Sequence, residues 1–333
     1  MKRYGYYPGC SLEKNARAYH DSAMIVADRL GIELIEVPDW NCCGATEYFA
    51  IAALPAYALV ARNLALAETL PLQGERQQLV APCSACFLNL SKTDHYMCES
   101  PQLAAQVNEA LAAGQLHYDP GSVFVRHLLD VIVDDVGYKS VSEQVTKPLF
   151  GLRVAPYYGC LVTRPDYNHI HNEPEYPFCL DDLLSAIGAT VVDYPVKTHC
   201  CGGHMTQISE DTALELIRRL LKSAHDYQAD VIVALCPMCQ LNLDGYQAQV
   251  NKHFGTDYHI PILYFTQVLG LAFGATPEEV GIGREFVDAR PLLNKIQTQP
   301  EEPPKKKRKK RSSKQALPMP EMLRMHPGKR NRP

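Results

Sequence analysis

The sequence contains Asn41-Cys42-Cys43-Gly44 and, in its second half, a further Cys-Cys-Gly stretch at Cys200-Cys201-Gly202. Each stretch follows a single cysteine and precedes a Cys-x-x-Cys pair. The cysteine blocks are separated by 31, 39 and 2 residues in the first copy and by 39, 34 and 2 in the second. The pattern includes ten of the twelve cysteines: Cys10, Cys42, Cys43, Cys83 and Cys86, then Cys160, Cys200, Cys201, Cys236 and Cys239. We call these five-cysteine sets the first nest and the second nest.

The residues around the cysteines repeat as well. Tyr-Pro-Gly precedes Cys10 and Tyr-Gly precedes Cys160, while Leu88-Asn89-Leu90 and Leu241-Asn242-Leu243 follow the two Cys-x-x-Cys pairs. So many agreements at matching places indicate a duplicated domain. We therefore expect a first domain at residues 1–150 and a second at residues 151–296.

The composition indicates a globular protein. The chain has 333 residues and is 46% apolar, and its longest apolar run, residues 49–61, is interrupted by Pro55 and is too short to span a bilayer. The N-terminus does not resemble a signal peptide, so we expect a cytoplasmic location. Thiols are kept reduced there, so the cysteines are expected to be metal ligands or redox groups rather than a disulfide framework.

The charge is divided unevenly along the chain. Residues 297–333 contain twelve Lys and Arg against three Glu, which is a net +9, and the total of -4 leaves -13 on residues 1–296. The tail is rich in proline and has seven consecutive basic residues at 305–311. We expect a disordered tail, either a solvated extension or a segment that docks on an acidic partner or on an anionic membrane surface. Its likeness to a nuclear import signal has little weight, and no nucleic-acid partner is expected.

Each half has the same predicted order of elements. In the first half, strands are expected at residues 3–7, 32–37 and 78–81, and helices at 16–30 and at 48–70, divided at Pro55. In the second half, strands are expected at 152–158, 190–194 and 231–235, and helices at 180–187 and 212–227. Residues 123–133 are expected to be helical.

Strands that alternate with helices predict an α/β fold with two pseudo-symmetric domains, each a small parallel sheet flanked by helices. Every cysteine block follows a predicted strand. Because ligands in such folds bind at the carboxyl ends of strands, the five thiols of each half are expected to converge there.

The cysteine spacing distinguishes two kinds of metal site. Four thiolates suit zinc and iron–sulfur clusters about equally. A structural zinc site closes at four ligands, usually from two Cys-x-x-Cys hooks, whereas each half offers one hook, one adjacent pair and one single cysteine. Five ligands favour a multinuclear cluster. A zinc-thiolate scaffold stays open as an alternative.

The duplicated pattern resembles the cysteine-rich CCG domains of heterodisulfide reductase B subunits and their bacterial relatives, over about residues 1–275. The resemblance implies one noncubane [4Fe-4S] cluster in each nest and cleavage of a disulfide between the clusters in two one-electron steps. It also implies a ferredoxin-like C subunit together with a flavin-bearing A subunit as partners, in a complex that could be peripheral to a membrane. Related bacterial proteins act in sulfur-oxidising complexes, in flavin-based electron transfer and in unusual succinate dehydrogenases, so a non-catalytic electron-transfer role is a further alternative.

Several other residues are candidates for lesser roles. His204 could donate a proton to a departing thiolate, although an oriented structural histidine is the more common role. The amides of Gly44 and Gly202 are expected to approach cluster sulfurs. Cys98 and Cys179 have no counterpart in the other half and are expected to be buried apolar residues. We expect surface positions for His169 and His171 and no nucleotide loop at residues 281–283.

Overall fold

The computed structural model describes residues 2–45, 48–72, 74, 76–165, 167 and 173–297. The predicted disordered tail lies outside these residues, apart from Gln297, and so do His169 and His171. Residues Met1–Pro300 form one compact unit. The division into domains at residue 150 stays a prediction.

The first half contains a four-stranded parallel sheet in the order β2-β1-β3-β4. Its strands are β1 (Lys2–Tyr6), β2 (Ile32–Glu36), β3 (Gln77–Ala81) and β4 (Val123–His127). Its helices are α1 (Gly9–Glu13), α2 (Arg17–Arg29), α3 (Tyr48–Ile51), α4 (Ala53–Glu68), α5 (Ser84–Glu99), α6 (Pro101–Ala112), α7 (Leu128–Asp130), the π-helix η1 (Val131–Val136) and α8 (Tyr138–Glu143).

The second half repeats this sheet in the order β6-β5-β7-β8. Its strands are β5 (Arg153–Tyr157), β6 (Thr190–Val191), β7 (Val231–Ala234) and β8 (Ile262–Tyr264). Its helices are α9 (Cys179–Ala186), α10 (Met205–Ile208), α11 (Glu210–Asp226), α12 (Pro237–Gly245), α13 (Gln247–Phe254), α14 (Phe265–Ala272) and the 3₁₀-helix η2 (Arg290–Lys295). The two parallel sheets confirm the predicted α/β class.

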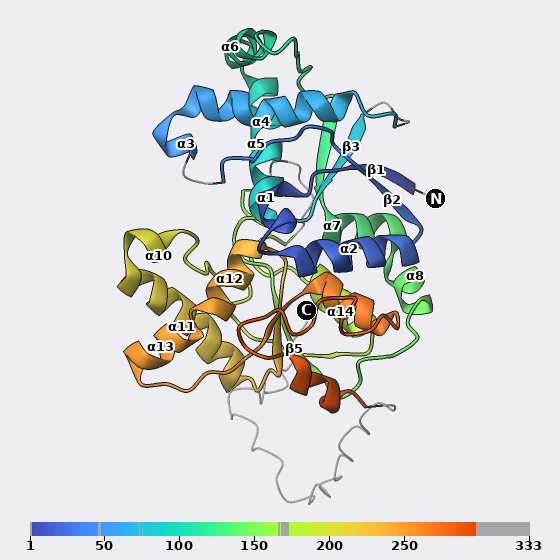
Figure 1. Ribbon diagram of the computed structural model, residues 1–333, viewed down its shortest axis with the longest axis vertical. Helices are drawn as coiled ribbons and strands as arrows, with labels where there is room; N and C mark the ends of the chain where they lie inside the picture. The colour runs from blue at the N-terminus through green and yellow to red at the C-terminus, as the bar shows by residue number, and fades with distance from the viewer. Residues whose placement is uncertain are drawn as a thin grey trace, which may run out of the picture. The chain divides into compact units, whose positions relative to one another are not determined.

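Both sheets have the crossover order that places a ligand site between two central strands. β1 pairs with β2 on one side and with β3 on the other, and β5 pairs in the same way with β6 and β7. The strand order therefore reverses next to β1 and next to β5, and such switch points are the usual ligand sites of open parallel sheets. The halves meet where α2 packs against α14, as Figure 1 shows.

The structure corrects several predicted elements. Residues 123–133 are not one helix, because β4 occupies Val123–His127 and pairs in parallel with β3. Its Val-Phe-Val start favours a strand, and periodicity alone does not separate a short apolar strand from a helix. The break in the predicted helix at 48–70 lies at Ala52, with Pro55 tolerated in the first turn of α4. β6 has only two residues, and β8 was not predicted.

Candidate thiol centre

The ten patterned cysteines lie beyond the carboxyl ends of the strands. Cys10 lies in α1 after β1, and Cys42 and Cys43 lie in the loop after β2. Cys83 occupies the N-cap position of α5, two residues after the end of β3, and Cys86 lies within the first turn of that helix. In the second nest, Cys160 follows β5 outside any helix, and Cys200 and Cys201 lie in the loop between β6 and α10. Cys236 is the N-cap residue of α12, after β7, and Cys239 lies in the first turn of that helix.

The thiols of the first nest form a continuous series of contacts. Cys10 Sγ lies 3.6 Å from Cys42 Sγ, and Cys43 Sγ lies 3.4 Å from Cys86 Sγ. The adjacent pair Cys42 and Cys43 interact through their side chains, and Cys86 interacts in the same way with Cys83. All five thiols predicted to act together are therefore linked in one series.

The second nest repeats the series. Cys201 Sγ lies 3.4 Å from Cys239 Sγ. Cys160 interacts with Cys200, Cys200 with Cys201, and Cys239 with Cys236. The duplication in the sequence is thus also a duplication of side-chain arrangement.

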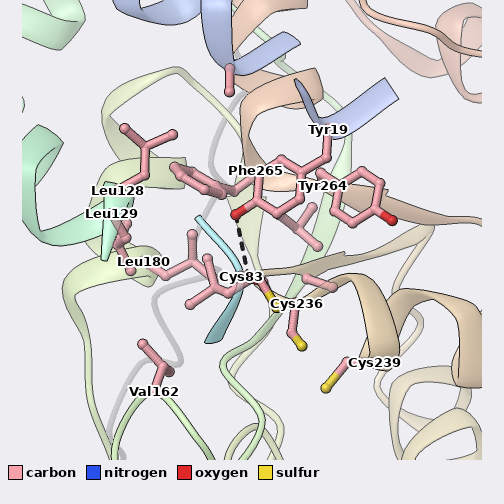
Figure 2. Packing of buried hydrophobic residues seen from close by; sticks show 14 of the residues in the cluster. Tyr19, Cys83, Leu128, Leu129, Val162, Leu180, Cys236, Cys239, Tyr264 and Phe265 are labelled. Atoms are coloured by element: carbon pink, nitrogen blue, oxygen red, sulfur yellow. Dashed lines mark hydrogen bonds between the residues drawn. The ribbon is translucent and has the colours of Figure 1, made fainter. Parts of the chain in front are cut away.

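The two series join at their inner ends. The side chains of Cys83 and Cys236 interact directly, and Figure 2 shows their sulfur atoms beside each other. The exposed fractions of these side chains are only 6% and 2%. The outer end of the first nest differs from this buried centre, because Cys10 and Cys42 are exposed. The ten thiols therefore form one path that is buried at its centre and reaches the surface at its ends.

A helix N-terminus lies at each inner end of the path. Cys83 and Cys236 have the extended backbone of N-cap residues at the starts of α5 and α12. The unpaired amides and the positive end of a helix dipole stabilise a negative sulfur there. The two inner thiols nevertheless differ in acidity. Interactions with Cys239 and Cys83 lower the pKa of Cys236 well below its usual range, whereas the interaction with Cys236 raises the pKa of Cys83.

Hydrogen bonds separate the acidities of the outer thiols. The hydrogen bond between the Cys10 and Cys42 thiols raises the pKa of Cys10 and lowers the pKa of Cys42 well below its usual range. The same pairing raises the pKa of Cys160 and lowers the pKa of Cys200. Each outer pair therefore contains one thiol that readily becomes the soft thiolate ligand of a metal.

The glycines around the cysteines leave room for sulfur. Gly9 and Gly159 have φ angles of +73° and +69°, and a Cβ atom on them would lie 2.9 Å from Cys86 Sγ and 3.2 Å from Cys239 Sγ. Only glycine accommodates both the left-handed backbone and the nearby sulfur. The amide of Gly202 donates to Cys200 Sγ at 3.3 Å, and its predicted approach to a cluster sulfur stays a prediction. The amide of Gly44 interacts similarly with Cys42.

Two asparagines hold the Cys-Cys-Gly loops in place by hydrogen bonds. The sequence pattern alone had given them no role. The side-chain amide of Asn89 donates to the carbonyls of Cys43, at 3.0 Å, and Ala45. The amide of Asn242 donates to the carbonyls of Cys201, at 3.2 Å, and Gly203, at 2.8 Å. The repeated Leu-Asn-Leu sequence was the signal that could have identified them.

A buried ion pair supports the second nest. Lys197 is 1% exposed, its Nζ lies 2.9 Å from Asp181 Oδ1, and it lies 3.9 Å from the centre of the Tyr176 ring. Its carbonyl accepts the amide of Gly159 at 3.2 Å. Lys197 therefore holds the segment that leads to Cys160, and nothing in the sequence pattern indicated this role.

A surface groove reaches the first nest. It has a volume of about 560 Å³ and is lined by Cys10 and Cys42 together with residues that include Glu13, Glu36 and Trp40. The indole N–H of Trp40 donates to Glu36 at 2.9 Å. A small molecule can therefore reach the outer thiols from solvent, through an acidic surface.

The remaining candidates are not part of this path of thiols. His204 is half-buried and directly precedes α10, so its role as a proton donor stays a prediction. Cys98 is exposed, contrary to the expected burial, and Cys179 is only partly buried. Within the described residues, no group of three or more His, Cys, Asp or Glu side chains is arranged to hold a single metal ion.

Fold and site together define a duplicated parallel α/β protein in which each half gathers five thiols. The profile of the CCG cysteine-rich domain matches residues 4–91 and 154–244, one match in each half. The chain belongs to this family. The resemblance predicted from the cysteine pattern is confirmed.

Curated relatives match almost along their whole length. The chain is 32% identical to the 8-methylmenaquinol:fumarate reductase membrane anchor subunit of Wolinella succinogenes, over 88% of this chain and 99% of that protein. It is 31% identical to the B subunit of the ferredoxin:CoB-CoM heterodisulfide reductase of Methanosarcina mazei, over 89% and 97%. A heterodisulfide reductase B-subunit-like protein of Archaeoglobus profundus is 30% identical, over 89% and 100%.

Among solved structures, a hypothetical protein from Helicobacter pylori is similar with a TM-score of 0.67 and 16% identity. The similarity covers 86% of this chain and 52% of that one, and it shows the fold alone. Among the described residues, no helix is long and apolar enough to cross a membrane.

Proposed function

We propose that this chain is the iron–sulfur subunit of a heterodisulfide-reductase-like complex, in which each nest holds one noncubane [4Fe-4S] cluster. The observation that carries the proposal is the series of ten interacting thiols, five from each half, which join at Cys83 and Cys236. Soft thiolates, an adjacent cysteine pair and five donors per half fit a multinuclear cluster better than one tetrahedral ion. The predicted zinc scaffold is the alternative that metal content tests.

The proposed reaction is the reduction of a disulfide to two thiols, or its reverse. Reduction breaks the sulfur–sulfur bond and consumes two electrons and two protons. When bound, iron–sulfur clusters exchange electrons one at a time, so two of them can share a two-electron step. The chain itself holds the inner thiols away from water and presents Cys10 and Cys42 to the acidic groove.

The electrons are proposed to come from partner subunits. Curated relatives with about 30% identity are named as B subunits of heterodisulfide reductases, which indicates a multi-subunit assembly. By that similarity, a ferredoxin-like C subunit together with a flavin-bearing A subunit are the proposed partners. A disulfide or a thiol is the proposed substrate.

A second candidate is an electron-transfer subunit that does not act on a disulfide. The relative with 32% identity is named as a subunit of a fumarate reductase. In addition, Cys83 and Cys236 interact through their side chains, which would let electrons pass between the nests without a substrate between them. Both candidates use the same nests and differ in whether a substrate reaches them.

The two candidates are separated by adding a thiol to the oxidised protein, purified without oxygen. For a disulfide-acting protein we expect the EPR spectrum to change at millimolar thiol, and reduced viologen to drive disulfide reduction. Access through the groove at Cys10 and Cys42 is the physical reason. An iron-loaded chain with an unchanged spectrum and no disulfide turnover would contradict the first candidate and favour the second.

A further inference from the structure

Tyr19, in the first turn of α2, contacts the segments that carry the innermost cysteine of each nest. Its side chain is fully buried, and its hydroxyl donates to the carbonyl of Pro82 at 2.8 Å and lies 3.3 Å from the carbonyl of Leu235. Pro82 directly precedes Cys83, and Leu235 directly precedes Cys236. One hydroxyl therefore joins the two segments whose thiols meet at the centre of the path.

Aromatic packing from the second half fixes the Tyr19 ring. The ring stacks on Tyr264 with centroids 4.3 Å apart and planes within 9°. Phe265 meets it edge-on at 6.1 Å. Figure 2 shows the stacked rings close to Cys83 and Cys236. A close-packed interior leaves the Tyr19 ring little space to move, so the position of its hydroxyl is fixed. The fixed hydroxyl therefore determines where the two carbonyls that it contacts lie.

The carbonyl of Leu235 has further donors, and they also come from the first half. Ser84 Oγ lies 3.3 Å from it, and His127 Nε2 lies at 3.3 Å. His127 Nδ1 accepts the amide of Leu129 at 3.1 Å, so Nε2 carries a proton and is the donor. The first half therefore holds the chain segment that leads to Cys236.

The second half has no equivalent donors to the first half at the positions that match Ser84 and His127. Between its paired cysteines, Pro237 occupies the place that Ser84 has in the first half, and proline has neither a hydroxyl nor an amide proton. Tyr264 occupies the N-cap position that corresponds to His127, and its hydroxyl donates to Gln240 at 3.2 Å. The link between the nests is therefore asymmetric and depends on the Tyr19 hydroxyl for Pro82.

We propose that Tyr19 is a positioning residue that fixes the separation of Cys83 and Cys236 and thereby the electronic contact between the two nests. This inference rests on the proposed function, because it concerns clusters that the nests hold. Without the hydroxyl, two buried carbonyls lose a donor. The Pro82 carbonyl then has no link to the second half through Tyr19, and of the three donors only Ser84 and His127 still hold the segment before Cys236, so the separation of the two cysteines is less tightly fixed.

The test compares Tyr19→Phe with Tyr118→Phe in the full chain, purified without oxygen. Tyr118 is also fully buried, but its hydroxyl donates to Asp94 at 2.5 Å, outside the nests. For Tyr19→Phe we expect wild-type iron content, a weaker spin–spin interaction between the two centres by EPR, and about tenfold slower disulfide turnover. For Tyr118→Phe we expect a wild-type spectrum.

An unchanged spin–spin interaction in Tyr19→Phe at full iron content overturns the proposal. If that variant does not fold, Ser84→Ala replaces it, because it removes only one donor to Leu235. Ser84→Ala keeps the Tyr19 hydroxyl on both carbonyls, so a wild-type spin–spin interaction at full iron content supports the proposal. A weakened interaction overturns it, because Ser84 rather than Tyr19 would then set the separation. These outcomes are distinct from failure of the proposed function, which an iron-free wild-type chain would show.

Discussion

Changing Cys43 to Ser is expected to remove the iron of the first nest and to abolish disulfide turnover, while the second half keeps its iron. Cys43 is 3% exposed and connects Cys42 with Cys86, so it lies in the middle of the series of thiols. A serine oxygen is a harder and shorter ligand that does not replace a soft thiolate there. Cys201→Ser is expected to do the same to the second nest, where Cys201 has the matching position.

The measurement is iron content together with turnover of the anaerobic protein. Each single variant should keep about half of the wild-type iron and lose activity by about a hundredfold or more, since two electrons are needed for each disulfide. Cys98→Ser is the matched control, because Cys98 is exposed and belongs to neither nest. Full activity in both nest variants would rule out the mechanism that uses two clusters.

Changing Asn89 or Asn242 to Asp is expected to be nearly as damaging, although neither residue is a proposed ligand. Each side-chain amide donates to two carbonyls of a Cys-Cys-Gly loop, and both asparagines are 3% exposed. A carboxylate has the same shape but donates no hydrogen bond when ionised. It loses both bonds and places a buried negative charge against carbonyl oxygens, at a combined cost of about 3–5 kcal/mol.

Iron content and urea unfolding of the same samples test this expectation. Asn89→Asp should lose the iron of the first nest and Asn242→Asp that of the second, and both should unfold at lower urea. Asn108→Asp is the control, because the side-chain amide of Asn108 donates to the carbonyl of Tyr118, and its oxygen accepts the amide of Tyr118, away from the cysteines. It should lose stability but keep its iron. Wild-type iron content in both nest variants would show that the loops do not need the amides.

The repeat in the sequence predicted most of the fold because it fixed the order of strands and helices twice. It could not separate helix from strand at Val123–His127, where a short apolar run fits both periods until β3 provides a partner. β8, with three residues, is too short for periodicity to identify. The predicted strand at 190–194 ends after Val191, since only two of its residues pair with β5.

The thiols of the site could be predicted because their spacing is repeated, and the structure brings each set of five together. The contacts between the halves could not be predicted, since Tyr19 and Leu235 are 216 residues apart and belong to different copies of the repeat. A duplicated pattern describes what the copies share. It does not show how one copy packs on the other, and the roles of Tyr19, Lys197 and Ser84 arise from that packing or from differences between the copies.

The central claim is that the ten thiols hold two iron–sulfur clusters. The most direct test is the iron, sulfide and zinc content of the chain purified without oxygen, with EPR of the same sample. The account predicts about eight irons and about eight sulfides for each chain, with a paramagnetic signal in the oxidised or partly reduced state. One or two zinc ions without iron would contradict it and would leave the nests as structural thiolate sites.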